Sequence, residues 1–125
     1  MRLEIRQRGI EVTEDLRNHV RQRLHVALGR FTRSIERVRV YLRDVNGPRG
    51  GVAKRCRIAV ELRRRGSVVV TGLDSDIFAA ISRTASRTKF AVRRRLKQRL
   101  ARRRRAAPAR RRGALNSLRA WREAA

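Results

Sequence analysis

The 125-residue sequence lacks most of the features by which membrane, secreted and metal-binding proteins are recognised. It has one cysteine, which excludes an internal disulfide and a cysteine-based metal cluster. No apolar run approaches the ~20 residues that a membrane-spanning helix needs. Residues 1–10 alternate between polar and apolar side chains and contain no apolar stretch typical of a secretory signal. We therefore expect a cytoplasmic protein with no membrane partner.

Acidic residues are also scarce. There are 10 of them against 35 basic residues, of which only three are lysine, so the net charge is +25. A charge of this size on a small protein repels itself unless a polyanion neutralises it, so the composition favours a nucleic acid as partner. Leu, Ile, Val and Phe number 32, about a quarter of the chain. That is more than disordered chains contain, and it is enough for one small core.

The apolar residues and the charge are unevenly distributed. Residues 1–100 hold 30 of the 32 large apolar side chains, with 26 basic and 9 acidic residues. Residues 101–125 hold only two, with nine basic residues and one acidic residue, which is too little apolar surface to order that segment alone. We predict a folded domain over residues 1–105 and a basic, flexible tail over residues 106–125.

Four segments have the side-chain pattern of strands. Apolar and polar residues alternate in them, so that one face of each strand is apolar and the other is rich in arginine. The predicted strands are residues 2–8, 37–44, 53–62 and a short one at 67–71. Between the second and third, residues 46–51 have the glycine and proline of a loop.

Two segments have helical periodicity. Thr13, followed by two acids, has the pattern of an N-cap, and the apolar spacing after it predicts a helix to about Arg30. A second helix is expected to begin at a cap formed by Asp74 or Ser75. Its apolar stripe breaks after Leu96, where a basic overhang follows, and Pro108 ends it at the latest.

The resulting order is β-α-β-β-β-α, an α+β fold. Its simplest arrangement is a four-stranded, mostly antiparallel sheet with both helices on one face. Because the first helix is a crossover connection, the first two strands can lie parallel.

No set of residues indicates an enzyme. His19 and His25 are six positions apart on the first helix, about 240° around it, so we interpret them as surface residues. Cys56 lies on the apolar face of a strand and is expected in the core. Asp74 and Asp76 are explained by capping. We therefore predict no catalytic residue, no metal, no cofactor and no small-molecule substrate.

The second helix and the residues after it contain the most informative pattern. From residue 77 to residue 122 there is no acid, while 17 residues are basic. Solvated helix faces usually mix the two signs, so this pattern favours a nucleic-acid surface read through phosphates and shape. Phe90 lies among the arginines, where it either stacks on an unpaired base or packs under the arginine side chains. Both interpretations remain open at this stage.

Three motifs, in order and suitably spaced, carry a family resemblance. Residues 11–17 are EVTEDLR, residues 38–42 are VRVYL, and residues 74–81 are DSDIFAAI. Together they resemble the first-helix entry, the second strand and the second-helix entry of the ribosome hibernation-promoting factors. The family's other names are ribosome-associated inhibitors and ribosomal subunit interface proteins, and this chain resembles its short form.

The resemblance implies a bacterial, non-enzymatic inhibitor of translation with a fold like a double-stranded-RNA-binding domain. Such a factor occupies the decoding region of the small ribosomal subunit under stress, covers the messenger and transfer RNA positions, and keeps idle ribosomes inactive. We expect a monomer in the free state. The expected contacts to ribosomal RNA are Arg83, Arg87, Lys89, Phe90, Arg93, Arg94 and Lys97 on the second helix, with Arg17, Arg21 and Arg23 on the first.

The chain departs from that family in three respects. Its second helix has no acids among the basic residues, and it has no room for the dimerising domain of the long members. Its tail is strongly basic, whereas some short members have an acidic or polar tail. Two alternatives remain: a general binder of structured RNA or DNA, and an interaction protein whose tail docks as a helix on a protein partner. Leu115, Leu118 and Trp121 would form the apolar edge of such a helix.

Overall fold

A computed structural model describes residues 2–45 and 53–98 of the chain. The elements, in chain order, are β1 (Arg2–Arg8), α1 (Glu14–Leu28), a 3₁₀ helix (Gly29–Ser34), β2 (Ile35–Asp44), β3 (Lys54–Leu62), β4 (Gly66–Asp74) and α2 (Ile77–Lys97). The predicted order and α+β class are confirmed. The loop at 46–51, the stop at Pro108 and the basic tail with its apolar edge lie outside the described residues. The predicted boundary after residue 105 lies outside them too.

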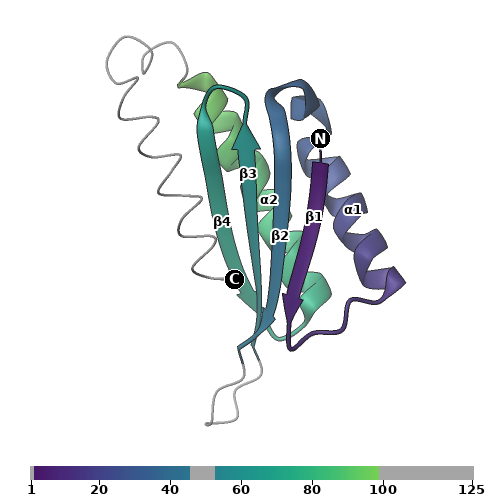
Figure 1. The fold of residues 1–125 in the computed structure, drawn as a ribbon. Coiled ribbons are helices and arrows are strands. Elements are labelled where there is room, and N and C mark those ends of the chain that lie inside the picture. The colour runs from purple at the N-terminus through teal and green to yellow at the C-terminus, as the bar shows by residue number, and fades with distance from the viewer. Residues whose placement is uncertain (1, 46–52, 99–125) are drawn as a thin grey trace.

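The four strands form one sheet in the order β1-β2-β3-β4. The β1 strand pairs with β2 in parallel, while β2–β3 and β3–β4 are antiparallel. The expected parallel first pair is therefore confirmed. Both helices lie behind the sheet in the view of Figure 1, so one face is covered and the other carries no described helix.

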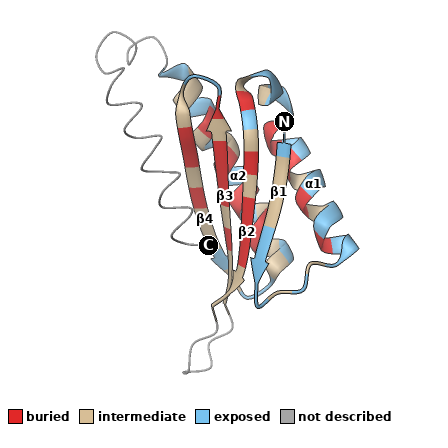
Figure 2. Ribbon diagram, in the orientation of Figure 1, coloured by how far each residue is buried: buried red, intermediate tan, exposed pale blue. Residues whose placement is uncertain are grey.

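The core lies between the helices and the covered face of the sheet. On that face Leu3 lies beside Val38 and Val38 beside Val60, and all three belong to the core or pack against it. Figure 2 shows the buried residues concentrated on the three strands β2, β3 and β4 and on the sides of the helices that face them. The helices contribute Leu16, Val20, Leu24, Ala27, Leu28, Ala80, Ile81, Ala85 and Val92.

The cap of the second helix lies two residues after Asp74 and one after Ser75, the two predicted alternatives. The N-cap is Asp76, whose Oδ1 accepts a hydrogen bond of 3.3 Å from the backbone N–H of Phe78. The prediction was wrong because β4 is longer than expected: it continues past Thr71 to Asp74, paired throughout with β3. The first helix also ends slightly early, at Leu28, and continues as the 3₁₀ helix.

The α2 helix packs closely against the sheet at Gly72. A Cβ atom at this position would collide with Oγ1 of Thr84 on α2, so only glycine fits between the two elements. Cys56 is the cross-strand neighbour of Gly72 and is fully buried. Burial raises the pKa of its thiol to about 12, which makes it an unreactive core residue, as expected.

Candidate nucleic-acid interface

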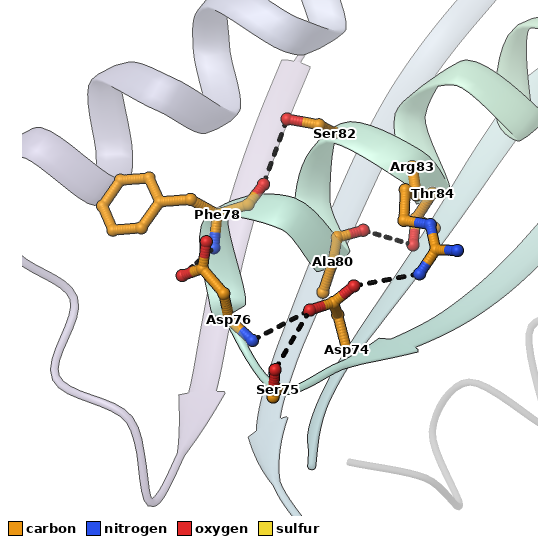
Figure 3. Close-up of polar contacts among 8 residues, drawn as sticks. All are labelled: Asp74, Ser75, Asp76, Phe78, Ala80, Ser82, Arg83 and Thr84. Atoms are coloured by element: carbon orange, nitrogen blue, oxygen red, sulfur yellow. Dashed lines mark hydrogen bonds and ion pairs between the residues drawn. The ribbon is translucent and has the colours of Figure 1, made fainter. Parts of the chain in front are cut away.

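The first turn of α2 is held to the end of β4 by a network around Asp74 (Figure 3). Its Oδ1 accepts a 3.0 Å hydrogen bond from the backbone N–H of Asp76, and its Oδ2 pairs with Nη1 of Arg83 at 2.9 Å. The hydrogen bond from Asp76 is the main cause that lowers the pKa of Asp74, and Arg83 lowers it further. The Arg83 side chain is 69% exposed but directed by this ion pair.

Two further arginines of α2 hold the helix to the same strand. Nη1 of Arg87 donates to the carbonyl oxygen of Thr71 at 2.9 Å. Arg95 donates from Nη1 to the carbonyl of Arg65 at 3.2 Å and from Nη2 to the carbonyl of Ser67 at 3.3 Å. We call Arg83, Arg87 and Arg95 the anchored set. Their donors already contact β4, so α2 meets a partner with these groups oriented by the sheet.

Three other basic residues near the end of α2 point into solvent. We call Arg93, Arg94 and Lys97 the outward set, because all three are exposed and none of their side chains makes a hydrogen bond or ion pair with another residue of the described ranges. With Phe90 and Gln98 they line a shallow hollow of about 380 Å³. Phe90 is 58% exposed there.

A second hollow lies between the two helices. It measures about 210 Å³ and is lined by Arg23, Val26, Ala27, Ser86, Lys89 and Phe90. Phe90 therefore borders both hollows, with Arg23 and Lys89 on one side and the outward set on the other. We call Arg23, Lys89, Phe90 and the outward set the helix-pair surface.

Of the remaining predicted contacts, Arg17 and Arg21 are exposed on α1 but line neither hollow. The structure thus brings six of the ten predicted residues together at one surface and separates the rest from it. Within the described residues no group of His, Cys, Asp or Glu is arranged to hold a metal ion. None of the described helices is long and apolar enough to cross a membrane.

Sequence reasoning missed the role of His19. Its Nε2 lies 3.0 Å from Oγ of Ser82 and 3.1 Å from the carbonyl oxygen of Phe78, and its ring meets the Phe78 ring edge-on at 5.0 Å. This half-buried histidine therefore joins α1 to α2 and fixes the two halves of the helix-pair surface relative to each other. Residue spacing within α1 holds no signal of a contact with a helix about sixty residues away.

Comparisons with known proteins agree with this fold. The N-terminal domain of Protein Y from Thermus thermophilus is 27% identical, with a TM-score of 0.64 over 75% of this chain and 98% of that one. A ribosomal subunit interface protein from Coxiella burnetii has the same fold, with a TM-score of 0.64 over 77% and 99% of the two chains, at 12% identity. No curated protein sequence matches the chain.

A family model adds the sequence evidence that the structures alone do not supply. The model described as "Sigma 54 modulation protein / S30EA ribosomal protein" matches residues 3–101, which includes every described element. Proteins of this kind are binding factors and not enzymes, as the sequence indicated. The resemblance drawn from three short motifs is confirmed: the chain belongs to the sigma 54 modulation protein / S30EA ribosomal protein family, the family of the ribosome hibernation-promoting factors.

Proposed function

We propose that this protein binds the small ribosomal subunit and holds idle ribosomes inactive by occupying the decoding region. The helix-pair surface contacts ribosomal RNA, and the bound protein excludes messenger and initiator transfer RNA. The factor acts in the cytoplasm, in response to stress, as a monomer whose net charge of +25 opposes self-association. Membership of a ribosomal protein family supports the ribosome as target.

One observation carries the proposal: the outward set surrounds an exposed aromatic ring, with no acid on α2 to neutralise it. Guanidinium groups bind phosphates through paired hydrogen bonds, and an aromatic ring offers a face on which an unpaired base stacks. The exposure of Phe90 favours stacking over the alternative, in which the ring is covered by arginine side chains. The arrangement suits RNA with unstacked bases next to phosphates.

The mechanism is occupancy and involves no chemical step. The sheet and the His19 contact hold the two helices in one orientation, so little ordering is needed when the surface meets RNA. Phosphate contacts position the protein, and the shape of the helix pair selects the site. The anchored set keeps α2 in place and adds positive potential beside the surface.

The direct test is co-sedimentation of the full-length protein with small subunits, together with competition by messenger and initiator transfer RNA. We expect binding that prevents both RNAs from associating. Its affinity should fall steeply with salt, by about 0.7 to 0.9 in log–log slope for each neutralised phosphate. Equal affinity for subunits and for an unrelated RNA duplex would contradict the proposal and favour a general RNA-binding protein.

A further inference from the structure

The face of the sheet that carries no described helix is unusually basic. Residues on this face alternate with core residues along each strand, and the strand register gives their lateral neighbours. They include Arg2, Arg6, Arg8, Arg37, Arg39, Arg43, Arg55 and Arg57. We call this surface the helix-free face; in Figure 1 it is turned toward the viewer.

Glu4 and Glu61 lie at outward positions of the described strands and both pair with the same residue, while Glu36 is exposed at the irregularity of β2 next to Arg37. Nε of Arg39 lies 3.3 Å from the Glu4 carboxylate and its Nη1 lies 3.6 Å from that of Glu61. Arg8, Arg43 and Arg55 form no ion pair with an acid of the described residues. Two acids at the end of the sheet, Asp44 and Asp74, pair with Lys54 and Arg83 on the covered side.

The arginines form a row across three strands. In the register Arg8 lies beside Arg43, and Arg43 beside Arg55. Neighbouring strands are about 4.8 Å apart, so the three arginine side chains leave the backbone next to one another at about that spacing. Like charges directly opposite each other destabilise a sheet, which means that this row costs stability in the free protein.

The next row shows the same crowding. Arg57 follows Tyr41 across the strands and donates from Nε to Oγ1 of Thr71 at 3.2 Å. Burial lowers the pKa of the Arg57 guanidinium, and the charge of Arg55 lowers it further. Nε of Arg37 is buried and donates a hydrogen bond to no described residue. Positive charge on this face is therefore concentrated and poorly compensated.

The occupant must be negatively charged. A second copy of the chain has a net charge of +25, and residues 101–125 have nine basic residues against one acid, so both are repelled. Closely spaced guanidinium groups match the oxygens of successive phosphates. From this geometry we propose that the helix-free face is a second RNA-binding surface, which binds a phosphate backbone through the row Arg8, Arg43 and Arg55.

Such a surface lies on the opposite side of the sheet from the helix-pair surface. The protein then contacts two RNA segments at once, one on each side, and acts as a wedge between them. This inference does not depend on the ribosome as target, because the charge arrangement alone carries it.

The test compares two triple variants of the full-length protein in binding to a 12-base-pair RNA duplex. The face variant is Arg8→Gln, Arg43→Gln, Arg55→Gln. The control is Arg30→Gln, Arg33→Gln, Arg63→Gln, which removes the same charge from exposed positions at the other end of the molecule. We expect the face variant to bind the duplex at least about tenfold more weakly than the control, because its charge-assisted contacts to phosphate are lost. It should also melt at a higher temperature, because repulsion within the row is relieved.

Equal affinity of the two variants for the duplex would overturn the inference, and so would equal competition by polyglutamate of the same charge. A second measurement uses the unaltered protein: the duplex should protect Arg43 and Arg55 from modification by phenylglyoxal. If saturating duplex leaves the modification of these two arginines unchanged, the proposed RNA-binding surface is contradicted. Failure of the proposed function would appear separately. In that case neither the face variant nor a variant of the outward set would lose subunit binding.

Discussion

The basic residues of α2 have the same chemistry but fall into two sets with different surroundings. The anchored set is bonded to β4 and to the turn before it through a carboxylate and three backbone carbonyls, while the side chains of the outward set make no hydrogen bond or ion pair with a described residue. Position relative to β4 therefore separates residues that are equivalent in composition. A positive charge is most available to a partner where the fold gives it nothing else to bind.

Reversing the outward set should have the largest effect on function. We expect Arg93→Glu, Arg94→Glu, Lys97→Glu to weaken small-subunit binding by at least about 100-fold, because three charge-assisted contacts of about 1.5–3 kcal/mol each are replaced by repulsion. The melting temperature of this triple variant should stay within about 2 °C of the wild-type value, since the three side chains are exposed. Co-sedimentation and thermal unfolding measure the two quantities. Wild-type affinity in a folded variant would refute the assigned surface.

The anchoring of α2 can be broken at its closest contact with the sheet. Gly72→Ala places a methyl group against Oγ1 of Thr84, so we expect the free energy of unfolding to fall by about 1–3 kcal/mol. Adding Thr84→Ala removes the colliding atoms and should restore part of the loss. Denaturant unfolding of both variants gives the comparison. No loss in the single variant would mean that α2 shifts at little cost.

Neutralising members of the anchored set should affect binding less than changes to the outward set. For Arg83→Gln, Arg87→Gln we expect an affinity for small subunits about three- to tenfold lower, because long-range attraction is lost while the direct contacts remain. Raising the salt concentration should erase most of this difference, since screening acts on distant charges. A loss as large as that of the outward set would place these arginines in the interface itself.

The smallest expected effect concerns the pH dependence of the network around Asp74 at the start of α2. The pKa of Asp74 is lowered in the folded state, so its ionised form stabilises the fold above the usual carboxyl value of 3.8. That contribution is lost as the pH falls through the depressed pKa. Asp74→Asn should therefore lower the melting temperature at pH 6 and have progressively less effect below pH 3.8. Thermal melts at several pH values measure this, and a difference that grows toward acid pH would contradict the assignment.

The sequence predicted the architecture well, because periodicity reports directly on which face of each element is buried. The alternation of Val38, Val40 and Leu42 identified both the strand and its buried side, and all three are fully buried. The residue at which β4 ends was harder to predict from periodicity. Gly72 and Leu73 have weak strand patterns, and their place in the sheet comes from pairing with Cys56 and Arg55 of β3.

The candidate site was predictable in composition but not in grouping. The sequence placed Phe90 among the arginines of the second helix, and both Phe90 and Arg94 are exposed in the structure. It did not show that Arg83 and Arg87 bond to β4, because those partners lie on another element. The interhelical role of His19 was hidden for the same reason. Contacts within one element follow from spacing, whereas contacts between elements require the assembled fold.

The order of the strands has a kinetic consequence. The β2, β3 and β4 strands are joined as consecutive antiparallel neighbours with α2 packed on β3 and β4, so this part closes only short loops. The β1 strand is separated from β2 in the chain by α1, so Arg2 must pair with Arg37 over a long loop. We therefore expect φ-values near zero for Val20→Ala in α1 and clearly higher ones for Val60→Ala in β3. If so, the helix-pair surface, which needs both helices, is completed only in the last folding step, and a partly folded chain has no binding activity.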